Sequence, residues 1–283
     1  MSRHSCFAAV LFGLGFALTV WIWHTNNPSR PARLADPPSA RLSQKARRAT
    51  RYEYADWCDM HMNAGGWVGI PHVSCDSGTL SVATCGEGHA DNWQWSSEAL
   101  RCGAHRLAAQ EVQSLLQDKW LVVAGDSITR FFFASLLRLL GSTEQVVFGH
   151  RDFEYTLGGN IRATFAWAPY AANISGLLST WSSGNTAPDL LVASAGLWHM
   201  LHIRLKTADK QQHLTQDSVD GYNSAIINSQ ILLPDGPFFL LDMHRLSQGC
   251  GAQCTHDGLH YSNATYDAAL QIWVNNVRLY LAS

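Results

Sequence analysis

The chain has 283 residues, of which 47% are hydrophobic and 15% are charged, and this composition favours a large folded core and excludes an intrinsically disordered protein. Its formal net charge is -2, from 20 basic and 22 acidic side chains. Because binding to a nucleic-acid backbone requires clustered Lys and Arg, this balance argues against a nucleic-acid partner.

An almost unbroken apolar run occupies residues 6–23 and contains no charged side chain. Its length is close to what a tilted helix needs to cross a bilayer. The run ends with Trp21 and Trp23 and lacks the small residues of a signal-peptidase site, so we predict an uncleaved signal anchor over residues 1–24. A cleavable signal peptide is the alternative. Residues 25–51, rich in Pro, Ala, Ser and Arg, are predicted to form a stem linker.

Six of the seven cysteines follow the apolar run, and an even set favours disulfides in an oxidising lumen over buried thiols in the cytosol. Asn173 and Asn263 each begin an N-glycosylation sequon. These features outweigh the basic residues after the run, whose charge alone favours the opposite membrane orientation. The simplest local disulfide joins the last two members of the set, which comprises Cys58, Cys75, Cys85, Cys102, Cys250 and Cys254.

Residues 52–105 are dense in Gly, Cys, Trp and His and show little helical or strand periodicity. We predict that they form a Cys/Trp-rich segment packed on the core. Its tryptophans, Trp93 and Trp95 among them, are interpreted as buried side chains that hold the segment in place, with a sugar-stacking platform as the alternative.

Apolar strands alternate with helices from residue 106 to residue 283, the predicted catalytic domain. Helices are expected over 107–117, 128–140, 216–231 and 264–280, and strands over 120–124, 146–148, 161–167, 189–194 and 237–242. Continuous apolar strands separated by helices are typical of a mainly parallel sheet covered on both faces. The sequence therefore predicts an α/β fold, a three-layer α/β/α sandwich.

Ser127 stands where the first strong strand gives way to a helix, at the sheet edge where α/β proteins bind ligands. Gly125 would allow a tight turn there. The start of the helix would present backbone N–H groups to an oxyanion forming beside the serine. The alternative is structural, with Asp126 and Ser127 acting as helix caps.

Asp257 and His260 lie shortly before the last predicted helix. A serine hydroxyl is a poor nucleophile until an oriented base takes its proton, and His260 could be that base with Asp257 orienting it. A capped helix with a surface histidine is the alternative. Four residues of the types that bind zinc lie close together, namely Cys250, Cys254, His256 and His260. We nevertheless predict no metal, because their spacing is too tight for an ordinary zinc finger and an oxidising lumen favours a disulfide.

Three sequence blocks follow one another along the chain. They are Cys58-Asp59 with Gly66-Trp67-Val68, Trp93-Gln94-Trp95 and Cys102; the run over residues 119–130 that contains Gly125-Asp126-Ser127; and Asp257-Gly258-Leu259-His260. Together they resemble the PC-esterase group of the GDSL/SGNH hydrolase clan, above all its plant trichome-birefringence-like members. The resemblance covers roughly residues 55 to 280. It implies an SGNH-like fold in a Golgi type II membrane protein, with secretion as the alternative, that moves acetyl groups on or off polysaccharide hydroxyls.

The resemblance also implies roles for individual residues. Ser127 would be the nucleophile and Asp257 and His260 the other triad members, with no bound cofactor and with acetyl-CoA or an acetylated carrier as the acyl donor. The clan usually adds a glycine and an asparagine as oxyanion donors, and the Gly196 block here has no asparagine. Candidates for oxyanion or substrate contacts are Asp126, Arg130 of the Gly-Asp-Ser-x-x-Arg signature, Gly159, Asn160, Gly196, Trp198 and His199.

The leading hypothesis is a serine-dependent O-acetyltransferase acting on carbohydrate, with a polysaccharide acceptor as its partner. A carbohydrate or lipid acetylesterase would use the same triad, so the residues alone do not separate the two. The third hypothesis is a catalytically silent, membrane-anchored glycan-binding protein. A metal-dependent glycosyltransferase is disfavoured because the chain has no Asp-x-Asp motif.

Overall fold

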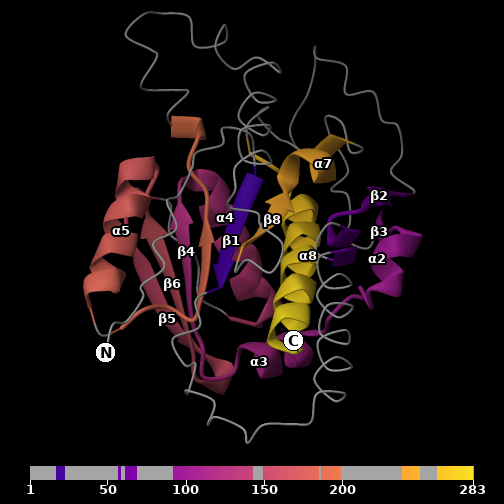
Figure 1. Cartoon of the computed structure of the whole chain (residues 1–283), viewed down its shortest axis with the longest axis horizontal. Helices are drawn as coiled ribbons and strands as arrows, with labels where there is room; N and C mark the ends of the chain where they lie inside the picture. Colours follow the sequence, from indigo (N-terminus) through magenta and orange to yellow (C-terminus); the bar gives the residue numbers. More distant parts are fainter. Residues whose placement is uncertain are drawn as a thin grey trace, which may run out of the picture.

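The computed structural model describes residues 17–22, 57–58, 61–68, 92–142, 149–184, 186–198, 238–248 and 260–282. These residues form a mixed α/β fold in which helices lie on both faces of a central sheet (Figure 1). The predicted boundaries of the anchor, linker, Cys/Trp-rich segment and catalytic domain stay predictions.

The described strands of the central sheet lie in the order β5-β6-β4-β7-β1-β8. β4 pairs in parallel with β6 and β7, whereas β5 is antiparallel to β6 and β1 is antiparallel to both β7 and β8. β6, β4, β7 and β8 therefore run in one direction, and β5 and β1 are additions that the sequence does not predict. The bounds are β1 Ala17–Ile22, β4 Trp120–Gly125, β5 Phe153–Leu157, β6 Ile161–Trp167, β7 Leu190–Ala193 and β8 Phe238–Asp242.

The N-terminal apolar run differs from the prediction at residues 17–22. The structure has strand β1 there, between β7 and β8, where the sequence predicts a membrane-spanning helix. A continuous apolar run with β-branched Thr19, Val20 and Ile22 suits a buried strand as well as a helix, because apolar pattern alone does not separate the two. Within the described residues, no helix is both long and apolar enough to span a bilayer.

Alternating side chains of β4 pack against different helices. Leu121 and Val123 belong to the cluster formed with α3, α4 and α8, whereas Val122 and Ala124 pack against α5. The described elements thus form three layers, as the alternation of strands and helices predicts. The helix bounds are α3 Ala109–Leu116, α4 Ser127–Leu139, α5 Ala171–Ser183 and α8 Asn263–Ala282.

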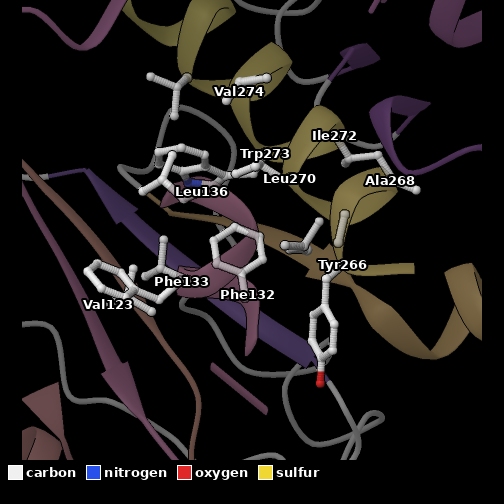
Figure 2. Close-up of a cluster of buried hydrophobic side chains, with 14 of the residues drawn as sticks. Val123, Phe132, Phe133, Leu136, Tyr266, Ala268, Leu270, Ile272, Trp273 and Val274 are labelled. Atoms are coloured by element: carbon white, nitrogen blue, oxygen red, sulfur yellow. The ribbon is translucent and has the colours of Figure 1, made fainter. Parts of the chain in front are cut away.

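Helices α4 and α8 pack closely against each other. Figure 2 shows Phe132, Phe133 and Leu136 of α4 beside Leu270 and Trp273 of α8. The Phe132 and Trp273 rings meet edge to face with centroids 6.0 Å apart, and both side chains are fully buried. Rings of this size bury enough apolar surface to fix one helix against the other.

Two amide side chains of α8 hold the segment that leads into α3. Gln271 accepts a hydrogen bond from the Leu107 N–H at 2.8 Å and donates one to the Leu107 carbonyl at 3.0 Å. Asn275 does the same with His105, at 3.3 and 2.8 Å. Both amides are buried, and the bonds of Gln271 satisfy the backbone groups of the buried residue Leu107.

The described part of the Cys/Trp-rich segment is short and stapled. It contains the antiparallel pair β2 Gly65–Trp67 and β3 Trp93–Trp95, followed by α2 Ser97–Arg101. A disulfide joins Cys58 to Cys102, with Cα atoms 5.5 Å apart. Trp93 is 3% exposed, so the prediction that the tryptophans of this segment are buried is confirmed for Trp93.

Hydrogen bonds tie this segment to the end of the sheet. Asn63 donates to the Leu240 carbonyl at 2.7 Å and accepts from the Asp242 N–H at 2.9 Å. Trp67 donates from Nε1 to the Leu246 carbonyl at 2.6 Å, within α7 Met243–Gln248. The segment therefore contacts β8 and α7 directly.

Most predicted elements that fall on described residues are confirmed. The exception is the predicted membrane-spanning helix, since the structure has strand β1 at residues 17–22. The structure also has elements that the sequence does not predict, namely β5, α5 and α7 together with the short β2, β3 and α2. The predicted strand at 146–148 and the predicted helix at 216–231 lie outside the described residues.

Candidate active site

Ser127 is the first residue of α4, directly after the turn that ends β4. Asp126 caps the helix, because its Oδ1 accepts a hydrogen bond from the Ile128 N–H at 2.9 Å. Gly125 has φ +155°, and a Cβ at this position would overlap the carbonyl oxygen of Ser194. The tight turn that presents Ser127 therefore requires glycine.

His260 lies against Ser127. The distance between His260 Nε2 and Ser127 Oγ is 2.8 Å, a hydrogen-bonding distance. His260 comes just before α8, and Ser127 begins α4, so the packed helix pair brings together two residues that are far apart in the sequence. The structure thus joins two of the three predicted triad members.

An aromatic side chain contacts the imidazole of His260. The Phe131 ring meets the His260 ring nearly edge to face, with centroids 5.3 Å apart and an interplanar angle of 69°. Phe131 also stacks on Tyr266 of α8 at 5.8 Å. This packing restricts the orientations that the imidazole can take.

Asp126 and Arg130 are buried ionisable side chains close to Ser127 and His260. Burial raises the pKa of the Asp126 carboxyl to about 6, although the Ile128 N–H, His260 and Arg130 each favour the ionised form and lower the pKa. Burial lowers the pKa of Arg130, and Asp126 opposes this effect. Arg130 donates from Nη1 to the Gly149 carbonyl at 2.8 Å.

Two of the predicted oxyanion or substrate residues lie at the same sheet edge as Ser127. Gly196 and Trp198 follow β7, which runs parallel to β4. The Ser194 N–H donates to the Ala124 carbonyl at 3.0 Å, so the chain leaving β7 passes beside the end of β4.

The prediction that Gly159 and Asn160 contribute to the oxyanion site is wrong. They form the short helix η2 Gly158–Asn160, which precedes β6, and β6 runs parallel to β4. Asn160 donates to Asp118 at 3.0 Å, and Asp118 lies before β4. A strand of this length spans roughly 20 Å, so the two residues lie at the opposite sheet edge from Ser127 and cannot donate to its oxyanion.

Other predicted residues fall outside the described part of the chain. These are Asp257, His199, Cys75, Cys85, Cys250 and Cys254, and their predicted roles and pairings stay predictions. Asn173 is exposed within α5, and Asn263 is exposed as the first residue of α8. Their glycosylation also stays a prediction.

No cluster of three His, Cys, Asp or Glu side chains suited to a metal ion occurs among the described residues. Of the four crowded zinc-ligand types only His260 is described, and its Nε2 faces Ser127.

Three aromatic residues near Ser127 are not among the predicted site residues. Trp167, Tyr170 and His150 gather with Trp198 at the carboxyl edge of the sheet. Trp167 is the last residue of a correctly predicted strand, and the rule that ligands bind at the carboxyl ends of parallel strands points to it.

The geometry supports a defined type of chemistry. His260 is placed to take the proton of the Ser127 hydroxyl, which makes the oxygen a nucleophile. The Ile128 N–H donates to Asp126, whereas the N–H of Ser127 itself, at the start of α4, could donate to a developing oxyanion. This arrangement is compatible with the serine-nucleophile type of chemistry that hydrolases and acyltransferases use.

Comparison with known proteins agrees with this type. The chain is 28% identical over 249 residues to the protein named Altered Xyloglucan 9 of Arabidopsis thaliana, a match that covers 65% of this chain and 68% of that protein. It is 30% identical over 155 residues to xyloglucan O-acetyltransferase 4 of Populus trichocarpa, covering 51% of this chain and 35% of that protein. No family model matches the chain, and no solved structure matches it. Both relatives are named for xyloglucan, and the second is named as an O-acetyltransferase.

Proposed function

We propose that this chain is a serine-dependent O-acetyltransferase of the trichome-birefringence-like family, within the PC-esterase group and with an SGNH-like fold, and that it acetylates polysaccharide hydroxyls. The observation that carries the proposal is the 2.8 Å contact between His260 Nε2 and Ser127 Oγ at the start of α4. The similarity to a xyloglucan O-acetyltransferase makes xyloglucan the first acceptor to test.

The reaction proceeds in two half-reactions. Ser127 Oγ attacks the acetyl carbonyl of the donor while His260 takes the hydroxyl proton, and His260 then returns this proton to the leaving group. The product is acetyl-Ser127. In the second half-reaction His260 takes a proton from the sugar hydroxyl, whose oxygen attacks the acetyl carbonyl. The bond from the acetyl carbon to Ser127 Oγ breaks, and His260 returns the proton to Ser127 Oγ. Asp257 is proposed to orient His260 throughout.

The donor is proposed to be acetyl-CoA or an acetylated carrier, used as a cosubstrate with no resident cofactor. We further propose that the enzyme works in the Golgi lumen. The disulfide between Cys58 and Cys102 supports an oxidising compartment, because such bonds are rare in the reducing cytosol.

The test is an acetyl-transfer assay with the full chain, an acetyl donor and xyloglucan oligosaccharides. Wild type is expected to yield acetylated oligosaccharide and Ser127→Ala to yield none. The control is Ser179→Ala, an exposed serine of α5 that donates only to the Ser175 carbonyl and is expected to behave as wild type. Free acetate without acetylated sugar would instead indicate an esterase, and equal activity of wild type and Ser127→Ala would contradict the site.

A further inference from the structure

Four aromatic side chains form one cluster, which we call the edge cluster: His150, Trp167, Tyr170 and Trp198. His150 stacks on Trp167 with centroids 4.4 Å apart and ring planes 13° from parallel. Trp198 stands edge to face against His150 at 5.1 Å, Trp167 at 5.4 Å and Tyr170 at 6.0 Å. Trp198 therefore stands at right angles to the stacked pair of His150 and Trp167, and these rings form a corner.

The edge cluster adjoins the turn that carries Ser127. Trp167 is the register partner of Gly125, two residues before the serine, and the Ala168 N–H donates to the Gly125 carbonyl at 2.9 Å. The guanidinium carbon of Arg130, in the first turn of α4, lies 6.0 Å from the centre of the Trp167 ring. The cluster thus contacts both the strand end and the helix start that position the nucleophile.

Backbone contacts hold the exposed member of the cluster beside the same helix. His150 follows Gly149, whose carbonyl accepts the 2.8 Å hydrogen bond from Arg130. Because Arg130 is itself 8% exposed, this bond fixes the loop that carries His150 against a buried side chain of α4.

The edge cluster differs in its exposure from the aromatic rings packed between α4 and α8. His150 is exposed, and Trp167, Tyr170 and Trp198 are each partly exposed, whereas the core rings Phe132 and Trp273 are fully buried. Large rings left in contact with water at a sheet edge that binds ligands are typical of a binding surface rather than of a core.

We propose that the edge cluster is the acceptor platform, on which a pyranose ring of the glycan stacks so that its hydroxyl reaches acetyl-Ser127. The choice of a sugar rests on the proposed function. The axial C–H groups of a pyranose form an apolar face that packs on aromatic rings. A corner of perpendicular rings suits a puckered sugar better than a flat nucleotide base, which needs a free parallel face.

The test measures glycan binding without turnover. The parent protein is the full chain carrying Ser127→Ala, and each variant adds Trp198→Ala, His150→Ala or Trp181→Ala to it. Binding of xyloglucan oligosaccharides to the parent and to each variant is measured by calorimetry. Trp181 is the matched control, a partly exposed tryptophan of α5 that packs edge to face on Trp120 at the start of β4. Loss of one stacking partner is expected to weaken binding about five- to tenfold for Trp198→Ala and His150→Ala. Trp181→Ala is expected to bind as the parent does.

Two further measurements keep the test sharp. Trp198→Phe retains a ring and is expected to bind the glycan more tightly than Trp198→Ala. Thermal unfolding of each variant identifies any that fails to fold. If Trp198→Ala fails to fold, His150→Ala, at an exposed position, is compared with the parent instead. Equal binding by parent, His150→Ala and Trp198→Ala would overturn the platform, as would displacement of the bound glycan by coenzyme A.

The outcome is separable from that of the proposed function. If wild type binds the glycan through the edge cluster but transfers no acetyl group, the transferase proposal fails and the platform stands. If wild type transfers acetyl normally and the cluster variants bind normally, the platform fails and the transferase proposal stands.

Discussion

Arg138 of α4 donates a 2.8 Å hydrogen bond from Nη2 to Asp267 Oδ1 of α8, and Asp267 also accepts from the fully buried Ser135 hydroxyl. These contacts join α4, which begins with Ser127, to α8, which begins shortly after His260. The helix pair is therefore held at two places, by the aromatic core and by this polar bridge.

Removal of the bridge is expected to destabilise the fold. Asp267→Ala should lower the free energy of unfolding by about 1–2 kcal/mol, mainly because the buried Ser135 hydroxyl loses its acceptor. The ion pair itself contributes little, since both side chains are more than a third exposed. Urea denaturation measures the change.

Glu154→Ala is the matched control for this variant, because Glu154 forms an ion pair of similar exposure with Arg162 across β5 and β6. It is expected to change the free energy of unfolding by no more than about 0.5 kcal/mol. An equal effect of both variants would show that the bridge between α4 and α8 has no special role.

The turn before Ser127 should not tolerate a side chain. Gly125→Ala is expected to cost about 3 kcal/mol or more, because the new Cβ overlaps the Ser194 carbonyl and the backbone adopts a positive φ. Gly176→Ala is the control, since nothing lies within 4 Å of its Cβ position in α5. Alanine there should stabilise by about 0.5–1 kcal/mol. Unfolding midpoints that move equally in both variants would contradict the close approach at Gly125.

The buried Asp126 carboxyl predicts a pH dependence. Its folded-state pKa is raised from 3.8 to about 6, so its contribution to stability is complete below 3.8 and is lost as pH rises through about 6. The loss amounts to about 3 kcal/mol at most, at about 1.4 kcal/mol per pKa unit. Asp126→Asn can still cap α4 but does not titrate.

The stability of Asp126→Asn relative to wild type should therefore increase as the pH is raised from about 4 to about 7. Urea denaturation of both proteins across this range measures the difference, and the other titrating groups largely cancel. A difference that is constant with pH would show that the carboxyl titrates normally despite its burial.

Phe131 is expected to position the catalytic base. Phe131→Ala removes the ring that packs on His260 and should lower kcat for an activated acetyl ester about tenfold with little change in KM. Phe131→Tyr keeps the ring and should recover most of the rate. A purely structural role would instead lower the unfolding temperature and leave the kcat of the folded fraction unchanged.

The sequence predicts the strand-turn-helix around Ser127 because Trp120–Gly125 is continuously apolar and α4 has a clear helical period. It does not predict α5, whose buried face consists of Ala171, Ile174 and Leu178 among Ser and Gly residues. At residues 17–22 the apolar pattern fits two structures, and the structure has the strand.

For the site, the approach of His260 to Ser127 could be predicted from residue types, but its distance depends on how α4 packs on α8. The error at Gly159 and Asn160 has a simple cause. Residues that precede a parallel strand lie at the opposite edge from residues that follow one, and these two precede β6. The same rule identifies Trp167 as a site residue.

Ser127 is proposed to carry the acetyl group between the two half-reactions. The most direct measurement is mass spectrometry of peptides from the full chain, quenched in acid after brief exposure to an acetyl donor without glycan. One added acetyl group is expected on the peptide that contains Ser127. It should be lost when xyloglucan oligosaccharide is added before the quench, and it should be absent from Ser127→Ala. Acetyl transfer to glycan by wild type with no acetyl-Ser127 detected at any time would contradict it.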